Sequence, residues 1–300
     1  MRTPPILKKG DTVAIAATAR KINPEEWQNA VNLLSSWELE VVFSENIAKS
    51  DHQFAGNDKE RRIGFQQLID DDNIKAIICA RGGYGTVRII DDLDFSHFSQ
   101  NPKWIVGYSD ITVLHSHIHR HFAIETLHSC MPYDFSAANP SPETIESCRS
   151  VLFGQPLNYE LQVHPLSRIG ACEGILCGGN LSILYSLTGT ASDIDTTNKI
   201  LFLEDVDEYL YHIDRMMLSL KRSGKLNCLK GLIIGSFSKM NDNAVPFGKN
   251  AEEIIVEAVS EYNYPVLFGF PAGHCNDNRA LVLGRNVKFD IQAAKATLCC

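Results

Sequence analysis

One serine of this chain lies where an apolar segment meets a helical pattern. Segment 103–108 reads Lys-Trp-Ile-Val-Gly-Tyr, and Ser109 and Asp110 follow it directly. A serine on such a strand-to-helix turn presents its Oγ above the edge of a sheet, near the positive end of the new helix. The backbone N–H of Asp110 can then point at a developing oxyanion. Because Ile111 replaces the second glycine of a Gly-x-Ser-x-Gly motif, an ordinary N-cap serine is the competing interpretation.

A glycine-rich turn follows a second apolar segment. Its residues are Arg81, Gly82, Gly83, Tyr84 and Gly85. Glycines after a strand permit positive φ angles and let the backbone approach a ligand closely, so this turn could bind an anion or donate a second N–H to an oxyanion. The spacing is neither that of a dinucleotide-binding fingerprint nor that of a P-loop, which disfavours a nucleotide cofactor. A plain turn is the alternative.

An acid and a histidine also follow strand-like segments. Glu204 ends an apolar run, and His274 lies on a loop after segment 265–270. Open α/β sheets place their sites at the carboxyl ends of the strands, so Ser109, Glu204 and His274 could meet at one such edge. Their order along the chain, serine then acid then histidine, is one of the known orders of catalytic triads. We therefore expect a serine nucleophile, a histidine base and an orienting carboxylate.

The acids that follow Glu204 have a simpler explanation. Asp205, Asp207 and Glu208 precede an amphipathic pattern that begins at Leu210, and we expect Gly224 to cap the end of this helix. Acids in the first turn of a helix offset its dipole. We assign them no catalytic role.

Four histidines alternate along one predicted helix, at His115, His117, His119 and His121. They form two i,i+4 pairs, a spacing that can chelate zinc. Alternate residues lie on different faces of a helix, so at most one pair could share an ion, and a third ligand is not evident. We favour a solvated or partner-facing helix and expect no metal.

Short apolar runs alternate with longer amphipathic stretches, the pattern of an α/β protein with mainly parallel strands. In the first half we expect strands at 12–17, 39–43, 75–80 and 104–108, and helices at 25–37 and 57–69. The second helix begins with an Asn57…Glu60 pairing that resembles a capping box.

The stretch from Ser136 to Ser167 contains four prolines and little regular pattern, so we place a domain boundary within it. Beyond it we expect strands at 174–177, 200–203, 231–235, 265–270, 280–283 and 287–291. Gly284-Arg285-Asn286 would form the hairpin turn between the last two. This ending predicts a β-rich second domain.

Composition excludes several classes of protein. The 300 residues carry a formal charge of −8, which argues against binding nucleic acid or an anionic membrane. The sequence shows no signal-like run and no membrane-spanning segment, so we expect a cytoplasmic location. Nine cysteines at irregular intervals, with no Cys-x-x-Cys pair, indicate neither a disulfide framework nor a zinc site.

Together these segments resemble the LD-carboxypeptidase family of serine peptidases, which includes muramoyltetrapeptide carboxypeptidases and microcin C immunity peptidases. The resemblance covers nearly the whole chain, and several motifs occur in the family's order. They lie at residues 7–13, 54–61, 80–85, 107–112, 178–181, 203–208 and 271–274.

The resemblance implies an N-terminal Rossmann-like or flavodoxin-like domain with a parallel sheet, here residues 1–150, which carries the nucleophile. It also implies a smaller β-rich, swivelling β/α domain at residues 168–300, which carries the acid and the base. Members of the family are typically homodimers that need neither a metal nor another cofactor.

The family's catalytic triad falls on Ser109, Glu204 and His274. Its oxyanion donors fall on the backbone N–H groups of Gly83 and Asp110. The implied activity is that of a carboxypeptidase that cleaves the L,D-peptide bond before the terminal D-Ala of peptidoglycan stem tetrapeptides, in the recycling of cell-wall muropeptides.

A carboxypeptidase must also hold the terminal carboxylate of its substrate. We expect backbone N–H groups around Gly82 and Tyr84 to do so, with a cation from Arg81 or Arg279. Segment 16–20 reads Ala-Ala-Thr-Ala-Arg where members of the family commonly have Pro-Ser, a departure that bears on substrate choice.

Two other functions stay open. One is an immunity-type peptidase of the same family, which would cleave a peptidyl-nucleotide antibiotic. The other is a binding module without catalysis, in which the glycine turns would hold a small anion. The second leaves the joint occurrence of Glu204 and His274 in matching motifs unexplained.

Overall fold

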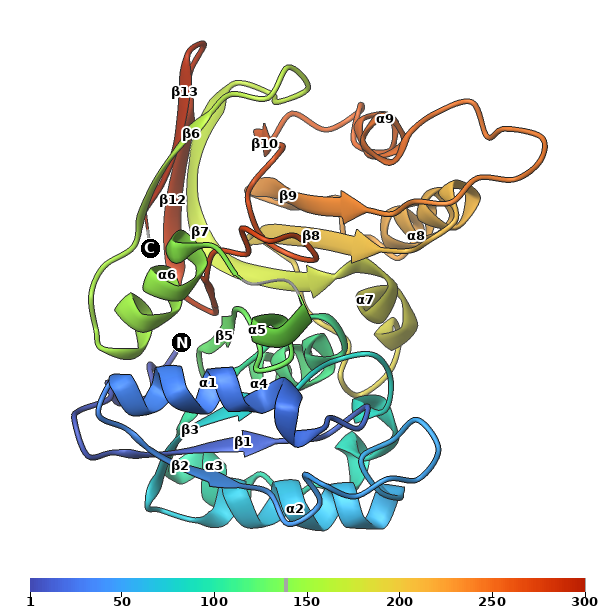
Figure 1. Cartoon of the computed structure of the whole chain (residues 1–300). Helices are drawn as coiled ribbons and strands as arrows, with labels where there is room; N and C mark the ends of the chain where they lie inside the picture. The colour runs from blue at the N-terminus through green and yellow to red at the C-terminus, as the bar shows by residue number, and fades with distance from the viewer. Residues whose placement is uncertain (138–139, 300) are drawn as a thin grey trace.

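Two β-sheets lie one above the other in the computed structural model, which describes residues 1–137 and 140–299 (Figure 1). The first sheet is mostly parallel, and the second combines parallel and antiparallel strands. The α/β class and the β-rich second domain expected from the sequence are confirmed. No helix within these two ranges is both long enough and apolar enough to cross a membrane.

The first sheet has the strand order β11-β5-β4-β3-β1-β2. Strands β1 to β5 run parallel, and β11 is antiparallel to β5. The strands are β1 (Thr12–Ala16), β2 (Glu40–Phe43), β3 (Ile74–Cys79), β4 (Trp104–Val106), β5 (Thr126–His128) and β11 (Leu281–Leu283).

Helices cover both faces of this sheet (Figure 1). Val13 and Ile15 of β1 belong to the same apolar cluster as Trp27 of the first helix, whereas Ala14 and Ala16 pack with the second, because successive strand residues point to opposite faces. The helices are α1 (Pro24–Ser36), α2 (Asp58–Asp70), α3 (Ser96–Gln100) and α4 (Thr112–Phe122). Three 3₁₀ turns accompany them, at Thr86–Arg88, Ile90–Asp92 and Ser109–Ile111.

The capping box expected at the start of α2 is confirmed. The Glu60 backbone N–H donates to Asn57 Oδ1 at 3.0 Å, and the Asn57 backbone N–H donates to Glu60 Oε2 at 2.9 Å. Two of the N–H groups left without partners at the helix start are thereby satisfied.

The second sheet has the strand order β10-β9-β8-β7-β12-β13-β6. Strands β7 to β10 run parallel, while β12, β13 and β6 are antiparallel to their neighbours. The strands are β6 (Asn158–Gln162), β7 (Gly170–Asn180), β8 (Ile200–Val206), β9 (Gly231–Ser238), β10 (Val266–Leu267), β12 (Asn286–Ile291) and β13 (Lys295–Cys299).

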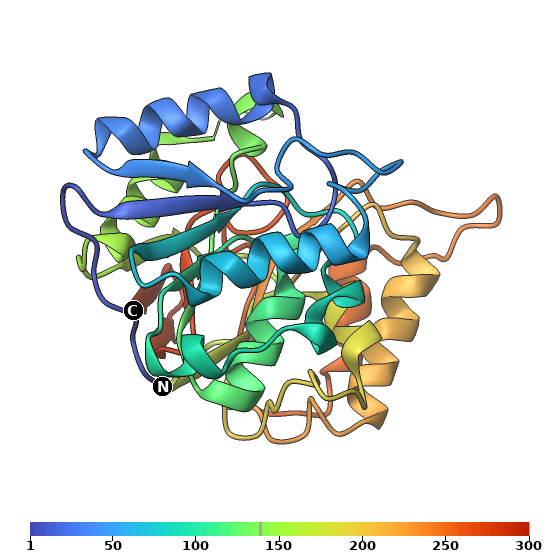
Figure 2. The ribbon, with the colours of Figure 1, turned by 90° about the horizontal axis from the view of Figure 1, so that it is seen from below.

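Three helices pack on one face of the parallel part of this sheet. They are α7 (Leu181–Leu187), α8 (Leu210–Arg222) and α9 (Ala251–Ala258). Ile213 and Met217 of α8 share an apolar cluster with Leu201 and Leu203 of β8. The segment between β9 and α9 projects from the body of the molecule (Figures 1 and 2).

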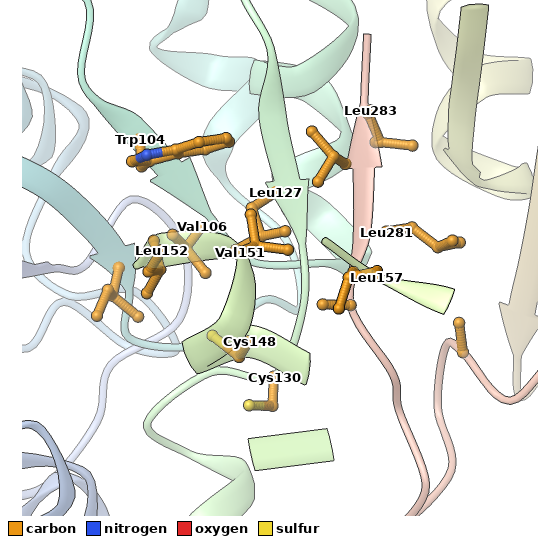
Figure 3. Close-up of a cluster of buried hydrophobic side chains, with 14 of the residues drawn as sticks. Trp104, Val106, Leu127, Cys130, Cys148, Val151, Leu152, Leu157, Leu281 and Leu283 are labelled. Carbon is orange, nitrogen blue, oxygen red and sulfur yellow. The ribbon is translucent and has the colours of Figure 1, made fainter. Parts of the chain in front are cut away.

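The hairpin predicted around Gly284 is wrong. The chain does turn there, with a φ of +95° at Gly284, but β11 pairs with β5 in the first sheet and β12 pairs with β7 in the second. The turn at Gly284 therefore leads the chain from the first sheet into the second. Leu281 and Leu283 pack with Trp104, Val106 and Leu127 of neighbouring strands, which explains why this short strand joins the first sheet (Figure 3).

The stretch 136–167, expected to be irregular, also contains regular elements besides β6. They are α5 (Asp134–Ala137) and α6 (Pro142–Leu152). Ser141 caps α6, since its Oγ accepts a hydrogen bond from the Thr144 N–H at 3.1 Å. Proline at the first helical position favours a helix start, so Pro142 supports α6 instead of breaking it.

The histidine-rich helix α4 is packed inside the chain, so the prediction of a solvated or partner-facing helix is wrong. It lies beside α7 (Figure 2). His115 is fully buried and its Nε2 donates to the Gly107 carbonyl at 2.9 Å, while His117 Nδ1 lies 2.9 Å from Ser192 Oγ. Among the residues described, no three His, Cys, Asp or Glu side chains gather to hold a metal.

Candidate active site

Ser109 is held in a conformation that few serines adopt. Its φ is +63°, in the left-handed region, at the junction between β4 and the turn that leads into α4. Such backbone strain persists only where the surroundings impose it, and it is typical of the nucleophile turn in α/β hydrolases. The residues on either side are anchored, because the Gly107 N–H donates to the Leu127 carbonyl at 3.0 Å and Asp110 is buried.

The glycine turn after β3 lies directly against this serine. A Cβ atom at Gly82 would stand 2.9 Å from Ser109 Cβ and 3.0 Å from its Oγ, so the approach requires glycine. The same position lies 3.3 Å from the Asp110 nitrogen. In the described ranges, the backbone N–H groups of Gly83 and Asp110 donate to no protein acceptor. Both groups are free to bind an oxyanion near Ser109.

The Asp110 side chain fixes the glycine turn from the inside. Its Oδ2 accepts a hydrogen bond from the Thr86 N–H at 2.9 Å, just beyond the turn. The buried guanidinium of Arg61 donates to the Gly85 carbonyl at 2.8 Å. Burial raises the pKa of Asp110, and the hydrogen bonds from the turn oppose this shift. The carboxylate of Asp110 thus holds the glycine turn in place, while its backbone N–H stays available to a ligand.

In the second sheet, Glu204 and His274 form a buried acid–base pair. Glu204 lies within β8 with no exposed surface, and its Oε2 is 2.7 Å from His274 Nδ1. A Cβ at Gly273 would stand 2.7 Å from that oxygen, so glycine is required beside the pair as well. Ser238 Oγ donates to the His274 carbonyl at 2.9 Å and fixes the loop. Glu204 therefore holds the imidazole ring, and Ser238 holds the backbone that carries it.

The two charges of this pair shift each other's pKa. Burial alone would raise the pKa of Glu204, but the positive charge and hydrogen bond of His274 leave it below its ordinary value. Burial opposes the protonated form of His274, yet Glu204 outweighs burial and raises the pKa of His274 above its ordinary 6.5. Because Glu204 occupies Nδ1, the nitrogen left for proton transfer is Nε2.

Tyr108 brings the two halves of the site together. Its ring meets the His274 ring edge-on, with 4.9 Å between the centroids, and the next residue is Ser109. No hydrogen bond joins Ser109 Oγ to His274 within the described ranges. Catalytic hydrogen bonds are often long without substrate and tighten when it binds.

The other residues expected to bind substrate lie in different settings. The Arg81 guanidinium stacks on the Tyr133 ring at 3.9 Å, and its Nη1 is 3.9 Å from Glu26 Oε1. Tyr84 is exposed, with its ring 6.1 Å from that of Phe54. Arg279 pairs with Asp277 at 2.9 Å and lines a different cavity from the one that His274 lines.

Sequence reasoning missed a role for Asp205. This residue lies in β8 and is buried, so it does not belong to the first turn of α8. Its Oδ1 accepts from Asn180 Nδ2 at 3.0 Å and its Oδ2 accepts from the Ser182 N–H at 2.8 Å. Burial, together with the neighbouring charge of Glu204, raises the pKa of Asp205 to about 7. Asp205 thereby ties the end of β7 to β8 next to Glu204.

A cavity of about 410 Å³ opens beside His274. Tyr108, Asp134 and Lys239 line it together with residues of the loop around Asn276. The sequence pattern singled out neither Tyr108 nor Asp134, although Tyr108 directly precedes Ser109. The site therefore combines a strained serine, two free N–H groups, an acid–histidine pair and a cavity large enough for an amino-acid side chain.

Two family models match the chain in agreement with this arrangement. The model of the LD-carboxypeptidase N-terminal domain matches residues 13–129. That of the LD-carboxypeptidase C-terminal domain matches residues 173–289. Ser109 lies in the first matched region, and Glu204 and His274 lie in the second.

Relatives in sequence agree with the family models. A protein of Bacillus subtilis (strain 168), a "Probable murein peptide carboxypeptidase", is 36% identical over 288 residues, covering 94% of this chain and 89% of its own length. A "Murein tetrapeptide carboxypeptidase" of Pseudomonas aeruginosa is 28% identical over 287 residues and covers 91% of both chains.

Solved structures show the same fold. The muramoyltetrapeptide carboxypeptidase from Oxalobacter formigenes is 30% identical, with a TM-score of 0.88 over 96% of this chain and 98% of its own. The microcin C7 self immunity protein MccF, in complex with aspartyl sulfamoyl adenosine, is 22% identical with a TM-score of 0.88 over 99% and 98%. The chain belongs to the LD-carboxypeptidase family.

Proposed function

We propose that this protein is a serine LD-carboxypeptidase that releases the terminal D-Ala from peptidoglycan stem tetrapeptides. The observation that carries the proposal is the buried Glu204–His274 pair, 2.7 Å apart, set beside the strained backbone of Ser109. Murein peptide and murein tetrapeptide carboxypeptidases among its relatives supply the substrate class. The catalytic residues in this proposal are Ser109, Glu204 and His274.

In the first step, Nε2 of His274 takes the proton of Ser109, and Oγ attacks the carbonyl carbon that precedes the terminal residue. The negative charge that develops on the carbonyl oxygen is stabilised by the N–H groups of Gly83 and Asp110. Glu204 holds the imidazole in the tautomer that leaves Nε2 free and stabilises the imidazolium.

The tetrahedral intermediate then collapses. The C–N bond breaks, His274 gives its proton to the departing amine of D-Ala, and the remaining tripeptide stays as an ester on Ser109. A water molecule, deprotonated by His274, attacks this ester and releases the tripeptide. Ser109 regains its proton from His274, so the enzyme returns to its starting state.

We propose that the chain divides into residues 1–150, which carry the nucleophile, and residues 168–300, which carry the acid and the base. Strand β11 belongs to the second part but pairs with β5 at the edge of the first sheet. The two parts are therefore joined by hydrogen bonds within one sheet. The homodimer and the cytoplasmic location expected from the sequence stay predictions.

The test is mass spectrometry of a muramoyl tetrapeptide incubated with the protein and, in parallel, with Ser109→Ala. We expect loss of one alanine residue with the wild type and a rate at least about 10⁴-fold lower with the variant. Equal rates for both proteins would refute Ser109 as the nucleophile. Absence of cleavage by the wild type would refute the murein substrate and make an aminoacyl-sulfamoyl nucleoside the next substrate to test.

A further inference from the structure

The side chain of Arg20 lies along one of the two glycines expected to donate to the oxyanion. A Cβ atom at Gly83 would stand 2.5 Å from Arg20 Cδ and 2.8 Å from its Nε. Gly83 also has a φ of +105°, so glycine is needed there both for the backbone and for this contact. The Arg20 side chain therefore adjoins the place where the carbonyl group of a substrate would be attacked.

The backbone that leads to Arg20 is fixed against the glycine turn. The hydroxyl groups of Thr18 and Thr86 share a buried hydrogen bond at 2.9 Å. Arg61 Nη1 donates to the Thr18 carbonyl at 2.5 Å and to the Gly85 carbonyl at 2.8 Å. These contacts join the two segments on either side of the site, so the start of the Arg20 side chain keeps its place beside the turn.

The Arg20 guanidinium is not used within the protein. Arg20 is exposed, and in residues 1–137 and 140–299 its side chain makes no hydrogen bond, ion pair or contact with an aromatic face. Two nearby arginines are engaged, since Arg81 stacks on Tyr133 and Arg61 is buried with backbone carbonyls as partners. Arg20 is therefore free to bind an anion that a ligand brings.

A peptide cut at its last bond brings such an anion. Only the departing nitrogen and one Cα separate the attacked carbonyl carbon from the carbon of the terminal carboxylate, through bonds of about 1.5 Å each. A substrate whose carbonyl oxygen binds the Gly83 N–H thus holds its terminal carboxylate within reach of the side chain that lies along Gly83. Lys239 is exposed too, but it lines the cavity beside His274, and Gly83 is not among the residues that line this cavity.

We propose that Arg20 binds the terminal carboxylate of the substrate and thereby selects peptides with a free C-terminus. The planar guanidinium can donate two parallel hydrogen bonds to a carboxylate. This inference rests on the proposed peptidase function and adds the residue that recognises the end of the substrate. Arg20 takes the role that the sequence suggested for Arg81 or Arg279. It ends segment 16–20, in which this sequence departs from the pattern common in the family.

Two tetrapeptides that differ only at the C-terminus test this role. One ends in D-Ala with its free carboxylate, and the other ends in D-alaninamide, which has nearly the same shape and no charge. We expect the wild type to cleave the acid about 10-fold faster than the amide in kcat/KM. This is the low end for a hydrogen bond to a charged group, because Arg20 is partly open to water.

Three variants assign the preference to one side chain. Arg20→Met should bring the acid-to-amide ratio close to one and leave cleavage of the amide nearly unchanged, because methionine keeps part of the stem and loses the charge. Arg20→Lys keeps the charge without the paired donors and should retain part of the preference. Lys21→Met removes the neighbouring exposed charge, whose Nζ donates to Ser50 Oγ at 3.1 Å, and should leave the ratio as in the wild type. Both rates in a ratio come from one preparation, so a folding defect in a variant cannot imitate these results.

An unchanged ratio in Arg20→Met would overturn the inference, as would a wild type that cleaves both peptides at the same rate. An equal loss of rate on both peptides in Arg20→Met would also overturn it, because Arg20 would then support the oxyanion and not the carboxylate. A preference that is lost in Lys239→Met but kept in Arg20→Met would place the carboxylate in the cavity beside His274.

If the wild type cleaves neither peptide, the proposed function fails, and the inference is tested by binding alone. Calorimetry then compares the two peptides on Ser109→Ala and on the double variant that also carries Arg20→Met. Tighter binding of the acid that disappears in the double variant would support the inference. Equal binding of the two peptides to Ser109→Ala, or binding of neither, would refute it.

Discussion

The two sheets hold their parts of the site by different physical means. On the first sheet, Ser109 is set by backbone geometry, a φ of +63° and the contact of its side chain with Gly82. On the second, Glu204 and His274 are set by a hydrogen bond between charged partners in a buried setting. The first arrangement depends on shape and the second on charge, so substitutions should damage them differently.

Histidines of the two regions show the same contrast. His115 and His119 on α4 are buried without an acid, and burial lowers their pKa values to about 4 and about 3. His274 is also mostly buried, but Glu204 raises its pKa above 6.5. A buried histidine becomes more basic where a carboxylate is hydrogen-bonded to its ring, as in His274, and stays neutral where that bond is missing, as in His128, whose pKa is lowered to about 3 although Glu204 is near.

Breaking the Glu204–His274 pair should lower activity more than disturbing the contact between Ser109 and Gly82. We expect Glu204→Gln to lower kcat by about 10³- to 10⁴-fold, because the imidazolium loses its partner and the imidazole its fixed tautomer. His274 accepts a proton only when neutral, so the acid limb of the wild-type pH profile lies above pH 6.5, and the variant's limb should move to lower pH. Profiles of kcat and of kcat/KM from about pH 5 to 9 measure the two effects. An unshifted limb would contradict the role given to Glu204.

Shape is tested by Gly82→Ala. The added Cβ would lie 2.9 Å from Ser109 Cβ, so the nucleophile must move, and we expect kcat/KM to fall about 10²-fold. Gly82 has no positive φ, so the thermal midpoint should change little. The comparison variant is Gly248→Ala, which strains a φ of +87° but meets no atom within 4 Å and should retain full activity. Equal activity of the two variants would show that the contact with Ser109 is unimportant.

The link between the two regions is tested by Thr112→Val. Thr112 Oγ1, at the start of α4, accepts the backbone N–H of Asn180 at 3.0 Å, and both residues are buried. Valine has the same shape and cannot accept, so the unpaired N–H should lower the free energy of unfolding by about 1–3 kcal/mol. Urea titration measures the loss. Ser99→Ala removes an exposed hydroxyl and should cost less than about 0.5 kcal/mol, and an equal loss in both variants would argue against the link.

The smallest effect is expected from the neutral histidines. Between pH 6.5 and about 4, unfolded His115 takes up a proton that the folded chain refuses, so stability should fall as the pH falls through this window. Glutamine can still donate to the Gly107 carbonyl but does not titrate. His115→Gln should therefore lose less stability than the wild type between about pH 6.5 and 5 in urea titrations. His52 is exposed, so the stability of His52→Gln should change with pH as that of the wild type does. If the stability of His115→Gln changed with pH in the same way as that of the wild type, the prediction would be contradicted.

Much of the site was predictable from local sequence. An apolar strand followed by a turn and a helix determines where Ser109 lies, and the capping pair Asn57 and Glu60 determines where α2 begins. Both depend on neighbours within a few residues. The pairing of Glu204 with His274 followed from motif order instead, since 70 residues separate them in the chain.

Other features depended on contacts that no local pattern records. The sequence around Gly284 specifies a turn, but the choice between a hairpin and a crossover was made by Leu281 and Leu283, which bury their side chains against the first sheet. Alternating histidines specify a polar helix, but the carbonyl of Gly107 and the hydroxyl of Ser192 supply the partners that allow α4 to be buried.

Residue types and short-range spacing are enough to predict the fold class, the strand-to-helix turn at Ser109 and the order of Ser109, Glu204 and His274 along the chain. The environment of these side chains depends on the tertiary structure. Burial, the Tyr108–His274 contact and the cavity that brings Asp134 near Lys239 arise where distant segments pack together. Hydrophobic packing selects those neighbours, and their distances then set the charges on which the chemistry depends.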